Sequence, residues 1–229
     1  LDDYYLNLLD WGKNNVLSVA LGDTVYLWNA SGGSIQKLMQ TTGLGSHVTS
    51  LSWMQEDDTN TLAVGTSDHK VLLWDTDKLK QVHSMNGHHG RVASLAWNNH
   101  LLSSGGRDSQ IIHHDVRVAD HKVLGVLKGH TAEVCGLKRS PQGTVLASGG
   151  NDNLLNIWDN RYVSTNSHTT DQPYTVLRLV YTVVLIWLQT CTSAGPILYS
   201  IDMVADLRLC IDRAKACTTT GAGTRTCAA

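Results

Sequence analysis

Histidine and carboxylate side chains are the groups in this sequence best suited to catalysis or metal binding. They are the adjacent pairs His88-His89 and His113-His114, with Asp108 and Asp115 nearby. Imidazole and carboxylate groups can bind zinc or transfer protons. However, neighbouring residues of a β-strand point to opposite faces, so neither pair is expected to chelate one metal ion. The sequence also contains no HExxH, GxSxG or P-loop pattern. We therefore expect no catalytic residue, no metal site, no cofactor and no enzyme activity.

The stretch from Gly129 to Asp159 has the residue order of one unit of a repeating β-structure. It opens with Gly129-His130, continues through two strand-like segments separated by turns, and ends with Trp158-Asp159. A Gly-His pair followed about 30 residues later by Trp-Asp, in a period of about 40–45 residues, is typical of a WD-repeat propeller blade. Each blade of this kind is a four-stranded antiparallel sheet, and the blades pack radially around a channel.

This unit recurs along the first 160 residues. Trp28 in VYLWN and Trp74 in VLLWD precede Trp158, and His114 in IIHHD takes the same place between the last two. The intervals are about 40 to 45 residues, which is the spacing of WD blades. We predict an all-β fold, a partial WD-repeat β-propeller of about four blades in residues 1–160. The predicted blades are residues 1–40, 41–86, 87–128 and 129–160.

The repeat gives several of the histidines a structural role. In a WD blade a His, a Ser or Thr, an Asp and a Trp can form a buried hydrogen-bonded chain, and buried polar groups are tolerated only when they are paired. The fourth unit has all four residues, whereas the third has His114 in place of the Trp. The first two units lack most of the set, because Val64 and Leu44 take polar positions in the second. The predicted structural set is His130, Ser148, Asp152 and Trp158, together with His88, Ser104 and Asp108.

The repeat pattern stops after Asp159, and residues 161–229 form a divergent tail. Residues 174–188 are an apolar, β-branched run that is too short for a membrane helix, which needs about 20 apolar residues. This run is either a strand that completes the fourth blade or an aggregation-prone segment. Residues 214–229 are expected to be disordered. The abrupt change of composition leads to the hypothesis of a shifted reading frame, a retained intron or an alternative exon.

Charge and cysteine placement exclude further classes of protein. The chain has 229 residues, a formal net charge of −2 and no run of five like charges, so we expect no nucleic-acid partner. No segment predicts a membrane span. The start, Leu1-Asp2-Asp3, is acidic where a secretory signal would be basic, so we expect an intracellular, reduced environment. Four of the five cysteines follow residue 190 and none forms a CxxC pair, which disfavours a zinc site.

Several segments are more specific than a general WD repeat. They are DDYYLNLLDW at residues 2–11, VYLWNA at 25–30, HHDVRV at 113–118, EVCGL at 133–137 and ASGGNDN at 147–153. Together they resemble, in a plant-like form, the Fizzy family of cell-division-cycle-twenty and Fizzy-related activators of the anaphase-promoting complex. The resemblance covers residues 1 to about 162.

This resemblance implies a non-enzymatic adaptor of the nucleus and cytoplasm. Family members activate a ubiquitin ligase, and the implied partners are anaphase-promoting complex subunits, degron-bearing substrate proteins and spindle-checkpoint proteins. The family residues that contact a KEN-box degron correspond here to Asp3, Asn151 and Asn153. A carboxylate can pair with the Lys of KEN, and side-chain amides can bond its Glu and Asn. Asn151 and Asn153 are explained equally well as turn residues around Asp152.

The sequence also departs from the family pattern. The resemblance implies a propeller of seven blades, whereas we expect about four from this sequence, with neither the ligase-docking segment before Leu1 nor the family's C-terminal Ile-Arg tail. We therefore expect an activator that is impaired by truncation. Two alternatives stay open: a non-functional gene fragment, and a generic WD-repeat scaffold with unrelated partners. Binding of a KEN peptide to the DDYY and GGNDN surfaces would discriminate among them.

Overall fold

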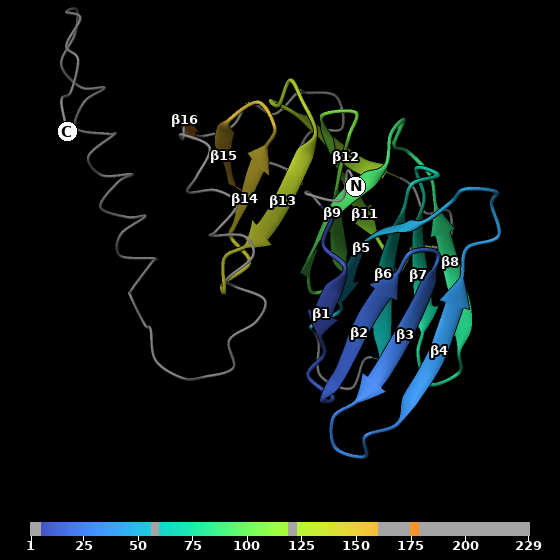
Figure 1. Ribbon diagram of the computed structural model, residues 1–229. Helices are drawn as coiled ribbons and strands as arrows, with labels where there is room; N and C mark the ends of the chain where they lie inside the picture. The colour runs from blue at the N-terminus through green and yellow to red at the C-terminus, as the bar shows by residue number, and fades with distance from the viewer. Residues whose placement is uncertain (1–5, 56–59, 119–122, 160–174, 179–229) are drawn as a thin grey trace, which may run out of the picture. The chain divides into compact units, whose positions relative to one another are not determined.

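The computed structural model describes residues 6–55, 60–118, 123–159 and 175–178, and all the regular structure in these ranges is β-strand. The strands form four sheets of four antiparallel strands each (Figure 1). Within every sheet the strands lie in the order of the sequence, each paired with the next. The prediction of an all-β fold built from repeated four-stranded units is therefore confirmed.

The four sheets follow one another along the chain. The first contains β1 (Leu9–Trp11), β2 (Val16–Leu21), β3 (Thr24–Asn29) and β4 (Ile35–Gln40). The second contains β5 (Val48–Trp53), β6 (Thr61–Thr66), β7 (Val71–Asp75) and β8 (Lys80–Met85). The third contains β9 (Val92–Asn98), β10 (Leu101–Gly106), β11 (Gln110–Asp115) and β12 (Val123–Lys128). The fourth contains β13 (Val134–Arg139), β14 (Val145–Gly150), β15 (Leu154–Asp159) and β16 (Thr175–Arg178).

The first strand of each sheet is the inner one. Strands β1, β5, β9 and β13 contact one another in succession, whereas the fourth strands do not take part in these contacts. Because the strands form antiparallel meanders, the turns between first and second strands all lie at one end of the sheets. The turns between second and third strands lie at the other end.

The turn between second and third strands has the same backbone in the last three sheets. It places an Asp before a residue with positive φ: His69 at 67°, Ser109 at 64° and Asn153 at 63°. A left-handed backbone conformation is costly for most residues. Glycine adopts it most readily, and Asn is the next most tolerant residue. The turn chemistry therefore fixes Asp68, Asp108 and Asp152 at equivalent places in their sheets.

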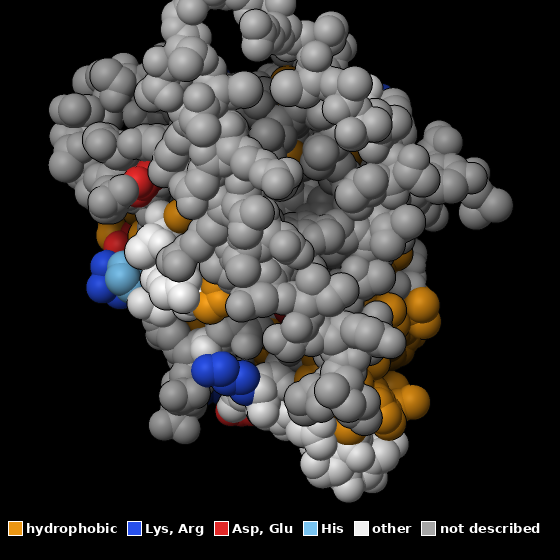
Figure 2. All heavy atoms as spheres, turned by 90° about the vertical axis from the view of Figure 1, so that its left-hand side faces the viewer, with side chains coloured by type: hydrophobic (Ala, Val, Ile, Leu, Met, Phe, Trp, Pro, Cys, Tyr) orange, Lys and Arg blue, Asp and Glu red, His pale blue; other side chains and the backbone are white. Residues whose placement is uncertain are grey.

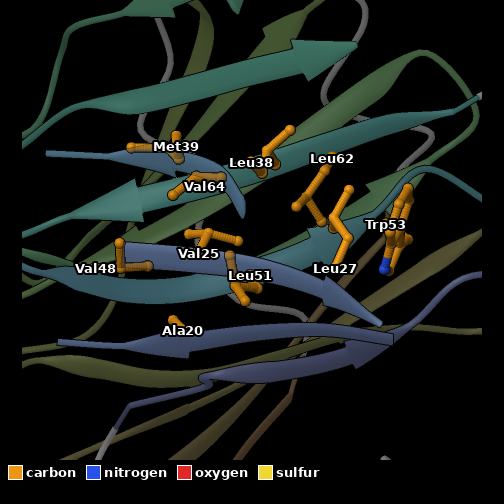
Figure 3. Packing of buried hydrophobic residues seen from close by; sticks show 10 residues of the cluster. All are labelled: Ala20, Val25, Leu27, Leu38, Met39, Val48, Leu51, Trp53, Leu62 and Val64. Carbon is orange, nitrogen blue, oxygen red and sulfur yellow. The ribbon is translucent and has the colours of Figure 1, made fainter. Parts of the chain in front are cut away.

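The hydrophobic core consists of three clusters, and each lies between two consecutive sheets. The first joins β2, β3 and β4 to β5 and β6, and Figure 3 shows Val25 and Leu27 of β3 beside Leu51 and Trp53 of β5. The second cluster joins the second and third sheets, and the third joins the third and fourth. Alternating side chains let each central sheet bury both of its faces, as a radial stack of sheets requires.

The apolar run at residues 174–188 supplies the outer strand of the fourth sheet. Strand β16 pairs antiparallel with β15, and the register places Leu177 opposite Leu155. The fourth sheet therefore extends past residue 160, where the sequence placed the end of the blade, because a connection intervenes before its last strand. Otherwise the predicted domain limits stay predictions.

Other sequence expectations fall outside the described residues. The rest of the tail, including the predicted disorder at residues 214–229, lies outside these ranges. In the part of the chain that the structure describes, we find no helix with the length and apolarity to cross a membrane.

Candidate functional site

A buried carboxylate anchors the β14–β15 turn of the fourth sheet. The Oδ1 and Oδ2 atoms of Asp152 lie 3.1 and 3.0 Å from Nδ1 of His130. The same carboxylate accepts hydrogen bonds from the Thr131 backbone N–H at 2.8 Å and from the Leu154 backbone N–H at 3.1 Å. Asp152 thus ties the turn to the loop before β13 and satisfies two backbone donors that the sheet ladder does not use.

The second nitrogen of His130 carries this connection into the core. With Nδ1–H directed at the carboxylate, Nε2 accepts the Ser148 hydroxyl proton at 2.8 Å. The Ser148 oxygen accepts in turn from the indole N–H of Trp158 at 2.8 Å. The side chains of His130 and Asp152 are 0% and 4% exposed. Each polar group of this chain has a partner, which is the condition for burying it.

Asp152 and its equivalent in the third sheet, Asp108, are held in their charged form. Burial alone would raise the pKa of Asp152, but bonds from the Thr131 N–H, His130 and the Leu154 N–H lower it below the ordinary value. For Asp108, burial is likewise outweighed by the bonds from His88 and the His89 N–H, and the pKa is lowered. Charged carboxylates make the stronger hydrogen bonds that hold these turns in place.

The third sheet contains three members of the same chain. His88 Nδ1 lies 3.1 Å from both oxygens of Asp108, and its Nε2 lies 2.8 Å from Ser104 Oγ. The His89 N–H donates to Asp108 Oδ2 at 2.8 Å. His114 takes the place of the Trp and is 1% exposed. The structure thus places the seven residues of the predicted structural set in two separate hydrogen-bonded groups, four in the fourth sheet and three in the third.

The second sheet has the same backbone without the polar chain. Trp74 corresponds to Trp158, but its buried Nε1 has no hydrogen-bond partner in the part of the chain that the structure describes. The reason is Val64, which stands in register where the fourth sheet has Ser148 and carries no acceptor. At the His position, Leu44 is fully exposed.

Of the three predicted degron-binding residues, the structure places two on one turn. Asn151 is exposed, and its backbone N–H donates to the Glu133 carbonyl at 2.8 Å. Asn153 is half-buried at the left-handed position, and its backbone N–H donates to the Gly150 carbonyl at 3.1 Å. Asp3 lies outside the described residues. The two asparagines therefore flank the anchored Asp152 and share its support.

An ion pair beside this turn was not predicted. Arg91 Nε and Nη2 donate to the two carboxylate oxygens of Glu133 at 2.7 and 3.0 Å, and the side chains are 17% and 7% exposed. Both residues immediately precede an inner strand, Arg91 before β9 and Glu133 before β13. Opposite charges at the same repeat position of neighbouring units are the sequence signal that could have revealed the pair. The ion pair fixes the position of Glu133, and the backbone carbonyl of Glu133 accepts the hydrogen bond from the Asn151 N–H.

The adjacent histidines of the third sheet are used in packing. His113 Nδ1 lies 2.8 Å from Ser103 Oγ, and Arg139 Nη2 donates to the same hydroxyl at 2.7 Å. Burial above all, with the charge of Arg139 and then that of His114, lowers the pKa of His113 to about 3. A buried, neutral histidine of this kind is poorly suited to proton transfer near neutral pH. Within the described ranges no group of three or more His, Cys, Asp or Glu residues is placed to hold a metal ion.

Two family models match adjoining parts of the chain. The model described as "RIG first beta-propeller" matches residues 8–123, and the model described as "WD domain, G-beta repeat" matches residues 121–159. These matches run from the first sheet through β15. The chain is a WD-repeat β-propeller protein, and the predicted fold class is confirmed, with four sheets described.

Curated relatives narrow the class to one family. The chain is 51% identical over 180 residues to "Anaphase-promoting complex subunit cdc20" of Dictyostelium discoideum, covering 78% of this chain and 36% of that protein. It is 52% identical over 169 residues to "Cell division cycle 20.5, cofactor of APC complex" of Arabidopsis thaliana, covering 73% of this chain and 37% of that protein. This chain belongs to the Fizzy, or cell-division-cycle-twenty, family, as its sequence predicted.

A solved structure is similar to this chain in both sequence and fold. The structure titled "Crystal Structure of Mitotic Checkpoint Complex" contains a chain with 44% sequence identity and a TM-score of 0.69. The match covers 78% of this chain and 51% of that one. The chain also spans 36% and 37% of the lengths of the two curated relatives, so it corresponds to a part of each.

Proposed function

We propose that this chain is a substrate-recognition adaptor and activator of the anaphase-promoting complex, a ubiquitin ligase of the cell cycle, and has no catalytic activity of its own. The observation that carries the proposal is the β14–β15 turn, where Asn151 and Asn153 flank an Asp152 that is held by the buried His130 and by two backbone N–H groups. Relatives named as subunits or cofactors of that complex, at about half identity, support it.

The ligand of the turn is a KEN-type degron in a substrate protein. Side-chain amides both donate and accept hydrogen bonds, so Asn151 and Asn153 suit the Glu and Asn of KEN, and Asp3 suits its Lys. The turn is fixed before binding, because its backbone donors are already paired with Asp152 and Glu133. A preorganised site loses less conformational freedom on binding.

The proposed partners are the subunits of the ligase, degron-bearing substrates and spindle-checkpoint proteins, met in the nucleus and cytoplasm. The support is the family membership and the similarity to a chain of a mitotic checkpoint complex. Four sheets supply part of the recognition face of a seven-bladed family.

Titration of the full chain with a fluorescent KEN peptide, followed by anisotropy, tests the proposal. Saturable binding is expected, and the triple variant Asp3→Ala, Asn151→Ala, Asn153→Ala is expected to lose about tenfold or more in affinity, as loss of several polar anchors does. A peptide of the same composition in scrambled order serves as the ligand control.

A matched triple variant keeps the test specific to one end of the sheets. Asp77→Ala, Asn14→Ala, Asn99→Ala removes the same residue types from turns at the opposite end. This variant is expected to bind like the original chain. If folded protein does not bind the KEN peptide, or if both triple variants bind equally well, the adaptor proposal fails and a scaffold with other partners takes its place.

A further inference from the structure

The inner strands of the last three sheets share a β-bulge at their second residue. In β5 the register of the ladder with β6 skips Thr49. In β9 and β13 the register skips Ala93 and Cys135 in the same way. A bulge leaves its extra residue outside the ladder, and a backbone carbonyl that stays unpaired away from water costs free energy. These three carbonyls therefore need hydrogen-bond donors from another part of the chain.

One residue before β1, Asn7, donates to all three bulge carbonyls. Its side-chain Nδ2 donates to the Ala93 carbonyl at 2.8 Å and to the Cys135 carbonyl at 3.3 Å. Its backbone N–H donates to the Thr49 carbonyl at 3.2 Å, and its own carbonyl accepts from the Leu51 N–H at 2.8 Å. An amide suits this place, because its NH₂ group offers two N–H donors. Asn7 thus connects the inner strands of three sheets.

The Cys135 bulge is bonded to the β14–β15 turn that carries the two asparagines. Cys135 Sγ donates to the Glu133 carbonyl at 3.3 Å, and the same carbonyl accepts from the Asn151 N–H at 2.8 Å. Burial raises the pKa of the Cys135 thiol to about 12, so the thiol keeps its proton and stays a donor. A continuous series of hydrogen bonds therefore runs from Asn7 through Cys135 and Glu133 to Asn151.

The other end of this series leads towards the third residue assigned to the degron. Asp3 precedes Asn7 by four residues in the sequence. Four residues of chain span at most about 14 Å even when they are fully extended. The bonds that fix Asn7 relative to Asn151 therefore also limit where the Asp3 carboxylate can lie relative to the turn.

Charge alone does not attract a peptide to the face of the molecule that Figure 2 shows. The charged side chains of the described residues stand there in small separate groups, without a patch of one sign. The whole chain has a formal net charge of only −2. A charged peptide is then bound through single contacts, and their strength depends on how well the groups are held in place beforehand.

We propose that Asn7 is a positioning residue for degron recognition, whose amide fixes the segment that carries Asp3 relative to the turn that carries Asn151. This inference rests on the proposed function. The Glu and Asn of KEN are bound by the turn, which Asp152 also holds. The Lys of KEN is bound by Asp3, and this contact is formed together with the others only while Asn7 fixes the distance between the two parts of the site.

Two peptides titrated against the full chain by anisotropy test this role: a KEN peptide and the same peptide with Ala in place of its Lys. The unaltered chain is expected to prefer the KEN peptide by about fivefold or more, as one charge-assisted hydrogen bond implies. In Asn7→Ala this preference is expected to fall to about twofold or less, while the affinity for the Ala peptide changes little. Asn7→Asp has the same size without the N–H donors, and the same result is expected.

Asn98→Ala is the matched control, because Asn98 also joins two sheets through a half-buried amide. Its Nδ2 donates to the Gly143 carbonyl of the fourth sheet at 3.2 Å, at the opposite end of β9 from Ala93. This variant is expected to lose stability as the Asn7 variants do and to keep the preference for the KEN peptide. Circular dichroism and thermal unfolding check that each variant folds.

The possible results separate this inference from the proposed function. Binding of the KEN peptide with an unchanged preference in a folded Asn7 variant would overturn the positioning role and leave the adaptor function standing. An equal loss of preference in Asn98→Ala, or failure of both Asn7 variants to fold, would make Asn7 a structural residue only. An unaltered chain that binds neither peptide would overturn both proposals.

Discussion

The second and fourth sheets have the same backbone but are held together by different chemistry. In the fourth, Trp158, Ser148, His130 and Asp152 form a buried hydrogen-bonded chain that ends at a surface turn. In the second, Val64 and the exposed Leu44 replace the Ser and the His, and the indole N–H of Trp74 is buried without a partner in the described residues.

The comparison shows that one kind of interaction forms the sheet and another fixes the position of its turn. Apolar packing is sufficient to build the sheet, since Val64 is fully buried in a cluster that joins the first two sheets. Apolar packing cannot satisfy backbone donors, whereas Asp152 accepts from the N–H group of Leu154 after the turn and from that of Thr131 in the loop before β13. The polar chain therefore adds a fixed turn to a sheet that packing alone can form, and this turn carries the two asparagines assigned to recognition.

The largest expected contrast comes from the two equivalent aspartates. Asp152→Ala leaves His130 and two backbone donors without their acceptor, and we expect a loss of about 3–5 kcal/mol in the free energy of unfolding. Asp68→Ala changes an exposed residue of the second sheet, so we expect a loss within about 0.5 kcal/mol. Urea unfolding of both variants measures the difference. Equal losses would mean that the polar chain does not distinguish the two sheets.

A pH titration extends the comparison to the third sheet, where His113 occupies the place of Leu73 and Ile157. The pKa of His113 is lowered from 6.5 to about 3, so below pH 6.5 the unfolded chain takes up a proton that the folded chain does not. As the pH is lowered from 6.5 towards 3, the free energy of unfolding is therefore expected to fall by up to about 1.4 kcal/mol per pH unit. His113→Leu should flatten the dependence of the free energy of unfolding on pH in this range, as measured by urea unfolding at a series of pH values. An unchanged pH dependence would show that His113 is protonated while folded.

The two tryptophans provide a smaller contrast. Trp158→Phe removes the donor to Ser148, and we expect it to cost about 1–2 kcal/mol more than Trp74→Phe, which removes a buried N–H that has no partner. Both substitutions remove the same atoms, so the difference combines the lost Trp158 hydrogen bond with the deeper burial of Trp158, which is 3% exposed whereas Trp74 is half-buried. Urea unfolding measures it, and similar losses in the two sheets would argue against an energetic role for that bond.

A small effect on stability is expected at Asn153, where turn chemistry and ligand contact make different predictions. Asn153→Gly keeps a residue that accepts the observed φ of 63°, so unfolding free energy should change by less than about 1 kcal/mol. If the side chain contacts the degron, KEN-peptide affinity still falls. Unchanged affinity in this variant would leave Asn153 as a turn residue only.

The sequence predicted the repeat because a few residue types at fixed spacing determine each unit. Gly129-His130, Asp152 and Trp158 are recognisable by their order, and the apolar run at residues 174–188 stood out as a candidate strand. The Arg91–Glu133 pair and the contact of His113 with Ser103 and Arg139 were not predictable in this way. Both depend on which positions of neighbouring sheets face each other, and that follows only from their packing.

The degron residues show a different limit. Asn151 and Asn153 suit a tight turn as well as a ligand, so their type alone could not decide between the two roles. The structure adds that Asn151 is exposed beside the Arg91–Glu133 pair, whereas Asn153 has the strained backbone.

The most direct test of the account is KEN-peptide titration of the Asp152→Asn variant, with Asp68→Asn as its control. Asp152 is buried and cannot itself contact the peptide, so any effect must pass through the turn that it holds. We predict weaker binding by Asp152→Asn, unchanged binding by Asp68→Asn, and circular dichroism that shows both variants folded. Full affinity in a folded Asp152→Asn variant would contradict the claim that the polar chain positions the recognition turn.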